Sequence, residues 1–308
     1  MVLSHRRPLT GRAAALACIA LLASVMALPL QAEVAPLTLY QRCGRSPWII
    51  IGTVADHDDR LARIKVVEVL KGSYDSATLR VVHRLENFLR ERWEGKIEFG
   101  PEEQVVLFLK RYDPEETQGT RIPRKLRAPD VFASSFGAQG VFALPAEGQE
   151  AYVEAVRAFA AATALEDPTE QEETVLGFLQ SANPHILQAG LEQVLDRQLA
   201  LPEHVTVLMR LVDYDREPVR LNALQVLEQV AGDLESSGRV LPNLADIVDR
   251  LKAKVLGSDS DLFRAESLKA VISFAGAAEA EFLRRLSRED PSQLVRYQAS
   301  RGLVELGE

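Results

Sequence analysis

Two hydrophobic patterns divide this chain. Residues 48–144 contain short β-branched runs and stretches in which apolar and polar residues alternate, as is typical of strands. From residue 150 onward, apolar residues return every three or four positions, which is the spacing of helices with one buried face. The patterns predict an α+β protein with two main domains, the first made of strands and the second of helices.

Five strands are predicted in the first domain, separated by turn residues. They cover residues 48–54, 62–70, 78–82, 104–110 and 140–144. Strands this short and this closely spaced fit a small closed barrel better than an open sheet.

Four pairs of helices are predicted in the second domain, after a connecting helix over residues 150–165. The pairs cover residues 174–179 with 184–195, 203–212 with 218–230, 244–256 with 262–274, and 278–286 with 291–306. Pro184, Pro218 and Pro291 each stand where a second helix begins, and there the missing N–H of proline costs nothing. Residues 232–241 form a polar insertion in the array, which we expect to be a loop.

The second helices repeat a short sequence. Residues 219–224 (VRLNAL) recur as residues 263–268 (FRAESL) and 295–300 (VRYQAS). Such units stack because one helix pair cannot bury its apolar face alone, and the stack offers an extended surface to a partner. With Pro-Val-Arg-x-x-Ala-Leu at residues 218–224, the array resembles HEAT repeats. The match is weakest in the first unit, where Leu187 stands at the arginine position.

One arginine stands at the same position in each of the last three units. Arg220, Arg264 and Arg296 are candidate partner-binding residues, because a guanidinium group binds carboxylates well. The alternative, which we favour, is a structural role in which each arginine pairs with an aspartate in a neighbouring turn. The aspartates placed to do so are Asp213, Asp215, Asp259, Asp261 and Asp290.

The strand domain resembles a known barrel. Residues 51–54 (IGTV), 66–72 (VVEVLKG), 104–109 (QVVLFL) and 139–142 (QGVF) are similar to the OB-type barrel of the netrin and tissue-inhibitor-of-metalloproteinase superfamily, as found in exported bacterial proteins. The resemblance covers residues 38–145 and concerns residues that maintain the fold. The resemblance implies that an inhibitor of this kind would place an amino-terminal cysteine at the metal ion of its target metalloprotease. Cys43 lies inside the chain instead, so we do not expect inhibition here.

A loop of the barrel could hold a metal ion. Asp56, His57, Asp58 and Asp59 place three carboxylates and an imidazole in four residues, and hard cations favour oxygen clusters. Adjacent residues in a tight turn point in different directions, so we favour a solvated hairpin turn.

A second loop is basic. Arg121, Arg124, Lys125 and Arg127 could bind an anionic partner or the acidic helical domain. A solvated loop is the simpler interpretation, and these four residues are further candidates for partner binding.

The first 32 residues have the pattern of a signal peptide. A basic start is followed by an uncharged apolar run over residues 13–30, and Ala32 is the small residue expected before cleavage. We predict a signal peptide over 1–32, a barrel domain over 33–147, a connecting helix and linker over 148–170, and a HEAT-like domain over 171–308. A retained membrane anchor and a lipoprotein signal ending at Cys18 are the alternatives. After cleavage Cys43 is the sole cysteine, so no intramolecular disulfide can form, and we favour a buried core thiol over a reactive one.

The charge of the chain and its lack of known catalytic motifs limit the classes of function that we expect. Residues 151–308 carry 16 Lys and Arg against 26 Asp and Glu, whereas residues 33–150 carry 17 against 18. An acidic array repels phosphate backbones, so we expect no binding to nucleic acid. No sequence pattern for nucleophilic, metal or disulfide chemistry occurs, so we expect no enzyme, cofactor or metal.

These observations together predict an exported scaffold. The expected protein is periplasmic or secreted, is not catalytic, and binds another protein or an envelope macromolecule; it touches a membrane only if the signal segment is retained. The alternative is an exported enzyme or enzyme inhibitor, with its active surface on the barrel and the helix pairs as a docking module. A third possibility is a structural envelope protein held by an uncleaved signal.

Overall fold

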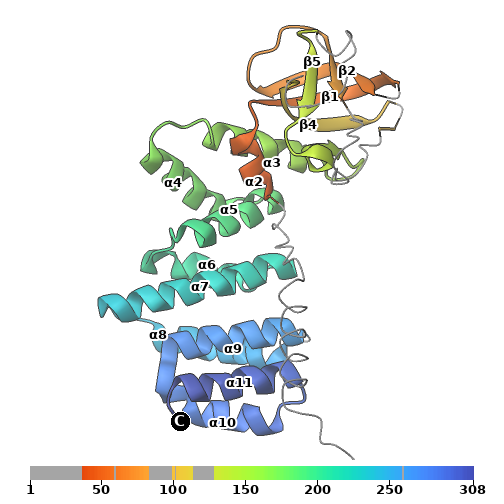
Figure 1. Ribbon diagram of the computed structural model, residues 1–308. Coiled ribbons are helices and arrows are strands. Elements are labelled where there is room, and N and C mark those ends of the chain that lie inside the picture. Colours follow the sequence, from red (N-terminus) through yellow and green to blue (C-terminus); the bar gives the residue numbers. More distant parts are fainter. Residues whose placement is uncertain (1–36, 59, 83–98, 101, 114–127, 259) are drawn as a thin grey trace, which may run out of the picture. The chain divides into compact units, whose positions relative to one another are not determined.

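The computed structural model describes most of the chain from Leu37 onward. The described residues are 37–58, 60–82, 99–100, 102–113, 128–258 and 260–308. Residues 38–308 form one compact unit, in which strands precede a series of helices (Figure 1). The predicted signal peptide lies outside the described residues. Within the described part, every helix is too short or too polar to cross a membrane.

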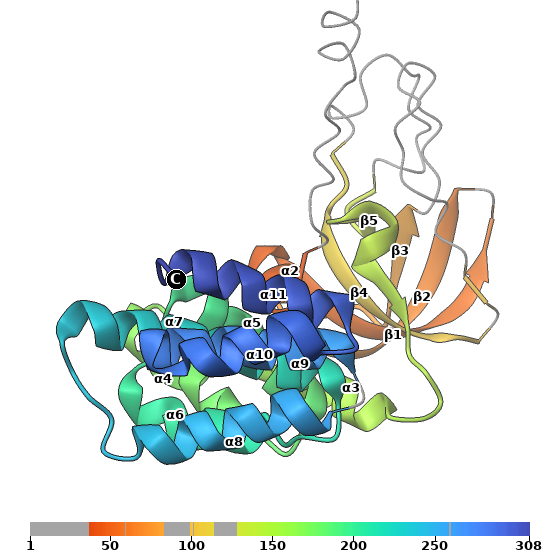
Figure 2. The ribbon, with the colours of Figure 1, turned by 90° about the horizontal axis from the view of Figure 1, so that it is seen from below.

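A closed five-stranded barrel forms the first part of this unit. The described strands are β1 (Trp48–His57), β2 (Leu61–Lys71), β3 (Thr78–Val82), β4 (Gln104–Arg111), β5 (Val131–Ser134) and β6 (Val141–Ala143). The ring runs β1-β2-β3-β5-β4, and β4 pairs back with β1 (Figure 2). β3 and β5 are parallel, and the other pairs are antiparallel. The predicted α+β fold with a small OB-like barrel is confirmed.

Bends in β1 allow the ring to close. The pairing of β1 with β2 shifts register between Ile49 and Ile50, between Ile51 and Gly52, and again before Asp56. Such bulges bend a strand and increase its twist. Gly52 permits a close approach at the bend, because a Cβ atom there would lie 2.8 Å from the carbonyl oxygen of Lys65. A single curved strand can therefore pair with β2 on one side and β4 on the other.

The strand that closes the barrel is not the one that the sequence pattern predicted. Residues 140–144 were expected to be its fifth strand, and they do contain β6, which pairs only with β4. The ring is closed instead by β5, which joins β3 to β4. β5 is four residues long, too short to give a periodic signal, and it adds the fully buried Phe132 to the core.

Apolar side chains fill the barrel. Phe132 makes edge contacts with the rings of Trp48 and Tyr74, at centroid distances of 5.5 and 5.4 Å. The buried members of this cluster are Ile50, Val54, Ala62, Ile64, Leu79, Val81, Phe99, Val105, Leu107, Leu109 and Phe132. Each of them is apolar, so the described interior is a packed core.

Two helices join the barrel to the array. α2 (Leu39–Arg45) was not predicted; it begins with a capping box, in which Thr38 and Gln41 bond to each other's backbone N–H groups. α3 (Gln149–Ala162) is the predicted connecting helix. Arg157 on α3 forms two hydrogen bonds with the Glu68 carboxylate of β2, at 3.0 and 2.6 Å. One hydrophobic cluster extends from β1 and β4 through both helices into the array.

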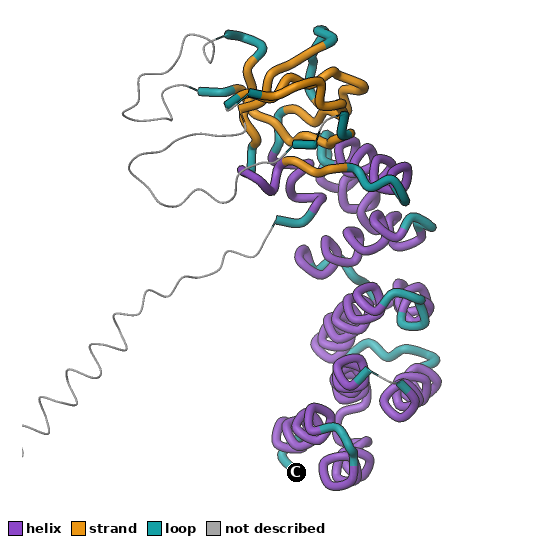
Figure 3. Tube along the Cα trace, turned by 90° about the vertical axis from the view of Figure 1, so that its right-hand side faces the viewer, coloured by secondary structure: helices purple, strands orange, loops and turns teal. Residues whose placement is uncertain are grey.

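Four helix pairs follow α3, as predicted. They are α4 (Pro168–Gly177) with α5 (Pro184–Arg197), α6 (Val205–Leu211) with α7 (Glu217–Ser237), α8 (Leu244–Gly257) with α9 (Asp261–Ala275), and α10 (Ala280–Glu289) with α11 (Gln293–Glu305). Helices of successive pairs lie side by side (Figure 3). Ala223, Ser267 and Ala299 are fully buried on the second helices, as expected where neighbouring helices approach closely.

Three details of the array differ from the prediction. α4 begins at Pro168, six residues before the predicted start at residue 174, because Asp167 caps it and Pro168 takes its first position. α7 continues to Ser237, so the insertion expected to be a loop is half helical. The reason is that Leu234 continues the apolar face of α7 and is buried. Pro291 lies just before Ser292, the N-cap of α11, rather than inside that helix.

Candidate partner-binding site

Arg264 is neutralised inside the array. Its Nη2 group pairs with the carboxylate of Asp290, its Nε donates to the carbonyl oxygen of Val255 at 2.6 Å, and its Nη1 lies 3.5 Å from Asp261. The Arg264 side chain is 9% exposed and that of Asp290 is 3% exposed. These contacts join the third helix pair to the fourth, so Arg264 has a structural role.

Arg296 has a more local role. Its Nη1 donates to the carbonyl oxygens of Asp290 and Pro291, at 2.6 and 3.0 Å. Both acceptors belong to the turn that precedes α11. Arg296 therefore closes the turn of its own unit, and its partners are carbonyl oxygens rather than a carboxylate.

Arg220 differs from the other two arginines. Its Cζ atom lies 4.6 Å from the centroid of the Phe263 ring, so the guanidinium stacks on that ring. Its Nε is buried and has no hydrogen-bond partner, and no ion pair joins the guanidinium to a described carboxylate. Asp213, one of the predicted partners, pairs instead with Lys254 and Arg250. Asp259, another, lies outside the described residues.

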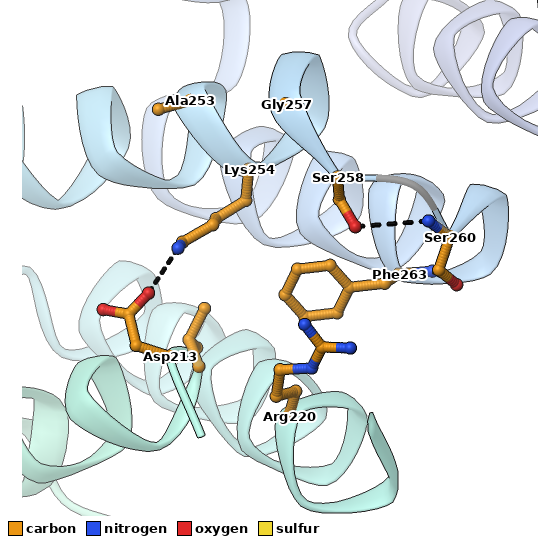
Figure 4. Close-up of a pocket in the computed structure, with 9 residues that line it drawn as sticks. Asp213, Arg220, Ala253, Lys254, Gly257, Ser258, Ser260 and Phe263 are labelled. Atoms are coloured by element: carbon orange, nitrogen blue, oxygen red, sulfur yellow. Dashed lines mark hydrogen bonds and ion pairs between the residues drawn. The ribbon is translucent and has the colours of Figure 1, made fainter. Parts of the chain in front are cut away.

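A cleft of about 470 Å³ opens between the second and third helix pairs at Arg220. The side chains that line it include Asp213, Arg220, Lys254, Ser258 and Phe263 (Figure 4). The three predicted arginines do not converge here, because Arg264 and Arg296 lie in later units. We refer to this site as the Arg220 cleft.

Local structure places each side chain at the cleft. Arg220 lies in the first turn of α7, and Lys254 lies in the last turn of α8, where a helix favours a positive charge. Ser260 is the N-cap of α9 and accepts a hydrogen bond from the N–H of Phe263 at 3.3 Å. The Ser260 hydroxyl also donates to Glu217. The ring of Phe263 is thereby held against the arginine.

The charges that line the cleft favour an anion. Burial acts to raise the pKa of Asp213, but hydrogen bonds and charges from Lys254 and Arg250 outweigh it, so that pKa lies below its usual value. Asp213 is therefore ionised at neutral pH and compensates Lys254. Arg220 remains as a cation without a described counter-ion.

Sequence reasoning missed three residues of the cleft. Lys254, Ser258 and Phe263 were not candidates, because each looks ordinary within its own helix pair. A signal was nevertheless present in the repeat. With Phe263 aligned on Val295, Ser258 falls on Asp290 and Lys254 falls on Leu286.

Two predicted loops of the barrel also contained candidate binding residues. The basic residues Arg121, Arg124, Lys125 and Arg127 lie outside the described residues. The turn predicted at residues 56–59 starts later than expected, because Asp56 and His57 still pair with β2 as part of β1, and Asp59 lies outside the described residues. Asp58 accepts hydrogen bonds from the N–H groups of Arg60 and Leu61, each at 2.8 Å. The described residues contain no group of three or more His, Cys, Asp and Glu side chains arranged to hold a metal ion.

Cys43 is a core residue. Its side chain is fully buried on α2, with Sγ 3.9 Å from the carbonyl oxygen of Val156. Burial raises the pKa of the thiol to about 12, against a smaller opposing effect of the nearby Lys71 and Arg42 charges. The nucleophilic thiolate is therefore scarce at neutral pH.

A second titratable group lies between α7 and α9. The Oε1 atom of Glu228 is buried without a hydrogen-bond partner. Burial, together with the charge of the neighbouring Glu266, raises the pKa of Glu228 to about 7 against a smaller opposing effect of Lys269. This carboxyl group lies where α7 packs against α9 and does not line the Arg220 cleft.

Comparison of the chain with protein-family models, with curated proteins and with solved structures gives no match.

Proposed function

We propose that this chain is a non-catalytic, exported interaction protein that binds a partner protein through a HEAT-like array of helix pairs. The observation that carries the proposal is the Arg220 cleft. Arg264 is satisfied by groups of the array itself, whereas Arg220 has no described counter-ion and lines an open cleft. Arg220 is half-buried and its buried Nε has no hydrogen-bond partner, so a carboxylate supplied by a partner would pair with a charge that the array leaves unpaired.

The barrel is proposed to support the array rather than to act on a substrate. Its described interior is filled with apolar side chains, and none of the described polar or charged side chains of β1 to β6 is buried. It shares a core with α2 and α3, which continue into the helix pairs. The resemblance to the netrin and tissue-inhibitor superfamily thus supports a shape rather than an activity.

The alternative is an exported enzyme or enzyme inhibitor that acts through the barrel. The inhibitory chemistry implied by the superfamily needs a cysteine at the metal. Cys43 is fully buried, and burial raises the pKa of its thiol to about 12. Both properties argue for the interaction protein over the inhibitor.

Export is proposed from the signal pattern of residues 1–32. Mass measurement of the protein recovered from the periplasm or the medium tests it, and a chain beginning at Glu33 is the expected result. An intact amino terminus would support the membrane-held alternative.

Affinity capture tests the binding function. The exported chain, carrying a carboxy-terminal tag, is compared with its Arg220→Gln variant for the proteins that each retains from a periplasmic extract. A partner retained by the first chain is expected to be lost from the second, because glutamine removes the charge of the cleft.

Arg301→Gln is the matched control. Arg301 pairs with Glu305 on the exposed surface of α11, away from the cleft, so its loss removes one charge from the array without affecting the site. The control is expected to retain the partner. Equal retention by all three chains would contradict the assignment of binding to the Arg220 cleft.

A further inference from the structure

The α8–α9 and α10–α11 turns are two copies of one structure. Ser258 and Asp290 each form the C-cap of the first helix of their pair. The hydroxyl oxygen of Ser258 accepts a hydrogen bond from the N–H of Ser260 at 3.3 Å, and the carboxylate of Asp290 accepts one from the N–H of Ser292 at 2.9 Å. Ser258 and Asp290 therefore occupy equivalent positions in consecutive units.

The other carboxylate oxygen of Asp290 neutralises the arginine of the preceding unit. It pairs with Nη2 of Arg264, and both side chains are almost completely buried. In this array, the carboxylate that satisfies an arginine is thus supplied across the unit boundary, by the C-cap of the next first helix.

Arg220 lacks that carboxylate, because the equivalent C-cap is Ser258. A serine hydroxyl retains the local cap but carries no charge. At Arg264 the carboxylate pairs with Nη2, whereas no described carboxylate pairs with the guanidinium of Arg220, and its Nε is also buried without a partner. The Phe263 ring lies against the guanidinium, with its centroid 4.6 Å from Cζ, and the Nη groups have no described carboxylate partner.

A second difference concerns a lysine that lines the cleft. Lys254 stands where the fourth unit has Leu286. It is compensated by Asp213, which leaves the charge of Arg220 for an external group. The second and third units therefore form a site that lacks the carboxylate found in the next unit and in which Arg220 is the cation without a described counter-ion.

We propose that the Arg220 cleft binds an aspartate or glutamate side chain of the partner protein, in the position that Asp290 takes at Arg264. This inference rests on the proposed function and names the chemistry of its site. The carboxylate accepts hydrogen bonds from the guanidinium edge, and the neighbouring atoms of the partner lie against Phe263.

The surroundings limit the kind of acidic segment that fits. Residues 151–308 carry 16 basic against 26 acidic residues, so the field around the array repels strongly acidic chains. A single carboxylate in an otherwise neutral or basic segment avoids most of this repulsion. The partner segment is therefore one with an isolated acidic residue.

A peptide copied from the array is a suitable probe. Residues 287–293 (SREDPSQ) contain the carboxylate that satisfies Arg264. With Gln at the position of Glu289 and with acetylated and amidated ends, the peptide presents the Asp290 carboxylate as its single acidic group. The Nε–H resonance of Arg220, assigned with an Arg220→Lys variant, reports its binding to the exported chain. We expect a saturable shift, and at least fivefold weaker binding of the peptide that has Asn at the position of Asp290.

Equal binding of the two peptides would overturn the role of the carboxylate. A third peptide, with the same Asn and a free carboxyl terminus, distinguishes the source. If it binds as well as the aspartate peptide, a chain terminus is the ligand and the side-chain assignment fails.

Variants of the chain test whether the site is open. Ser258→Asp places a carboxylate where Asp290 stands in the next unit, and we expect at least tenfold weaker peptide binding together with a higher melting temperature. Ser300→Asp adds the same charge on α11, away from the cleft, and is expected to bind the peptide as the unchanged chain does. Unchanged binding by the Ser258→Asp chain would contradict the proposal.

Asp259→Asn tests whether the chain itself supplies a carboxylate to the cleft and so competes with the peptide. If the open cleft is correct, this variant binds the peptide with unchanged affinity. A tenfold gain would mean that Asp259 already supplies the carboxylate, and the proposal would fail.

The two proposals fail in different ways. If Arg220→Gln loses the captured partner but the peptides bind alike, the interaction function stands and the carboxylate assignment falls. If partner capture is unchanged by Arg220→Gln, binding does not occur at this cleft, whatever the peptide does.

Discussion

Removal of the Asp290 carboxylate measures what a cross-unit ion pair contributes to this array. The change Asp290→Ser retains a hydroxyl that can accept the hydrogen bond from Ser292, as Ser258 does from Ser260 in the preceding unit. It deletes the group that pairs with Arg264. The substitution therefore reproduces, in the fourth unit, the arrangement found at Arg220.

The expected loss of stability follows from burial. The Arg264 side chain is 9% exposed, so the variant leaves a nearly buried charge without its main partner. Loss of one partner from a buried pair costs about 3–5 kcal/mol. Two groups stay near the guanidinium, the Val255 carbonyl oxygen and the Asp261 carboxylate, which places the expected loss near the lower end, at about 3 kcal/mol.

Urea unfolding followed by circular dichroism gives the magnitude. With an m-value of about 3 kcal/mol/M, the midpoint should fall by about 1 M. Hydrogen exchange should locate the loss in α9, α10 and α11, because the lost ion pair joins α9 to the turn between α10 and α11.

Asp261→Asn is the matched control on the same arginine. Asp261 lies 3.5 Å from Arg264 but is 61% exposed, so water screens the pair and its loss should cost less than about 1 kcal/mol. Equal costs for the two variants, or a cost below about 1 kcal/mol for Asp290→Ser, would refute the argument from burial.

Two further predictions concern helix packing. The pKa of Glu228 is raised to about 7 by burial and by Glu266, so the folded chain holds this proton more tightly than the unfolded chain and stability falls as pH rises from about 4.5 to 7. Glu228→Gln should remove this fall and add about 1–2 kcal/mol at pH 8, reduced for partial exposure, as measured by urea unfolding across pH. Gly190→Ala should cost about 1–3 kcal/mol, because the new Cβ would lie 2.6 Å from Cβ of Phe178.

Each of these two predictions has its own contrary result. A stabilisation by Glu228→Gln that persists unchanged at pH 4 would show that its cause is not ionisation. For Gly190, the control is Gly177→Ala, whose new Cβ meets no atom within 4 Å and should stabilise α4 by a few tenths of a kcal/mol or more. If both alanines stabilise the chain, Phe178 moves aside and the packing argument is wrong.

Local patterns predicted most of the secondary structure. The four helix pairs were found from apolar spacing and helix-start residues, because both signals act within a few residues along one helix. Long strands such as β1 and β2 were found for the same reason. The end of α7 was missed because the polar residues around Leu234 hide the single apolar contact that extends the helix.

Features that depend on distant partners were not predicted. β5 is a strand because β3 and β4 hold its four residues between them, and the chain that leads to it gives no periodic signal. α2 was missed in the same way, since its Tyr40 and Cys43 are buried largely against α3.

The three repeated arginines show most clearly which properties follow from the sequence and which follow from the tertiary structure. The sequence by itself determined that an arginine recurs at one position of each of the last three units, because the repeat is visible in the spacing of residues along the chain. Only the tertiary structure decided that Arg264 is neutralised, that Arg296 closes its own turn and that Arg220 faces an open cleft. The reason is physical: the charge state of each arginine's surroundings depends on what the next unit places against it, and that contact exists only when the units stack.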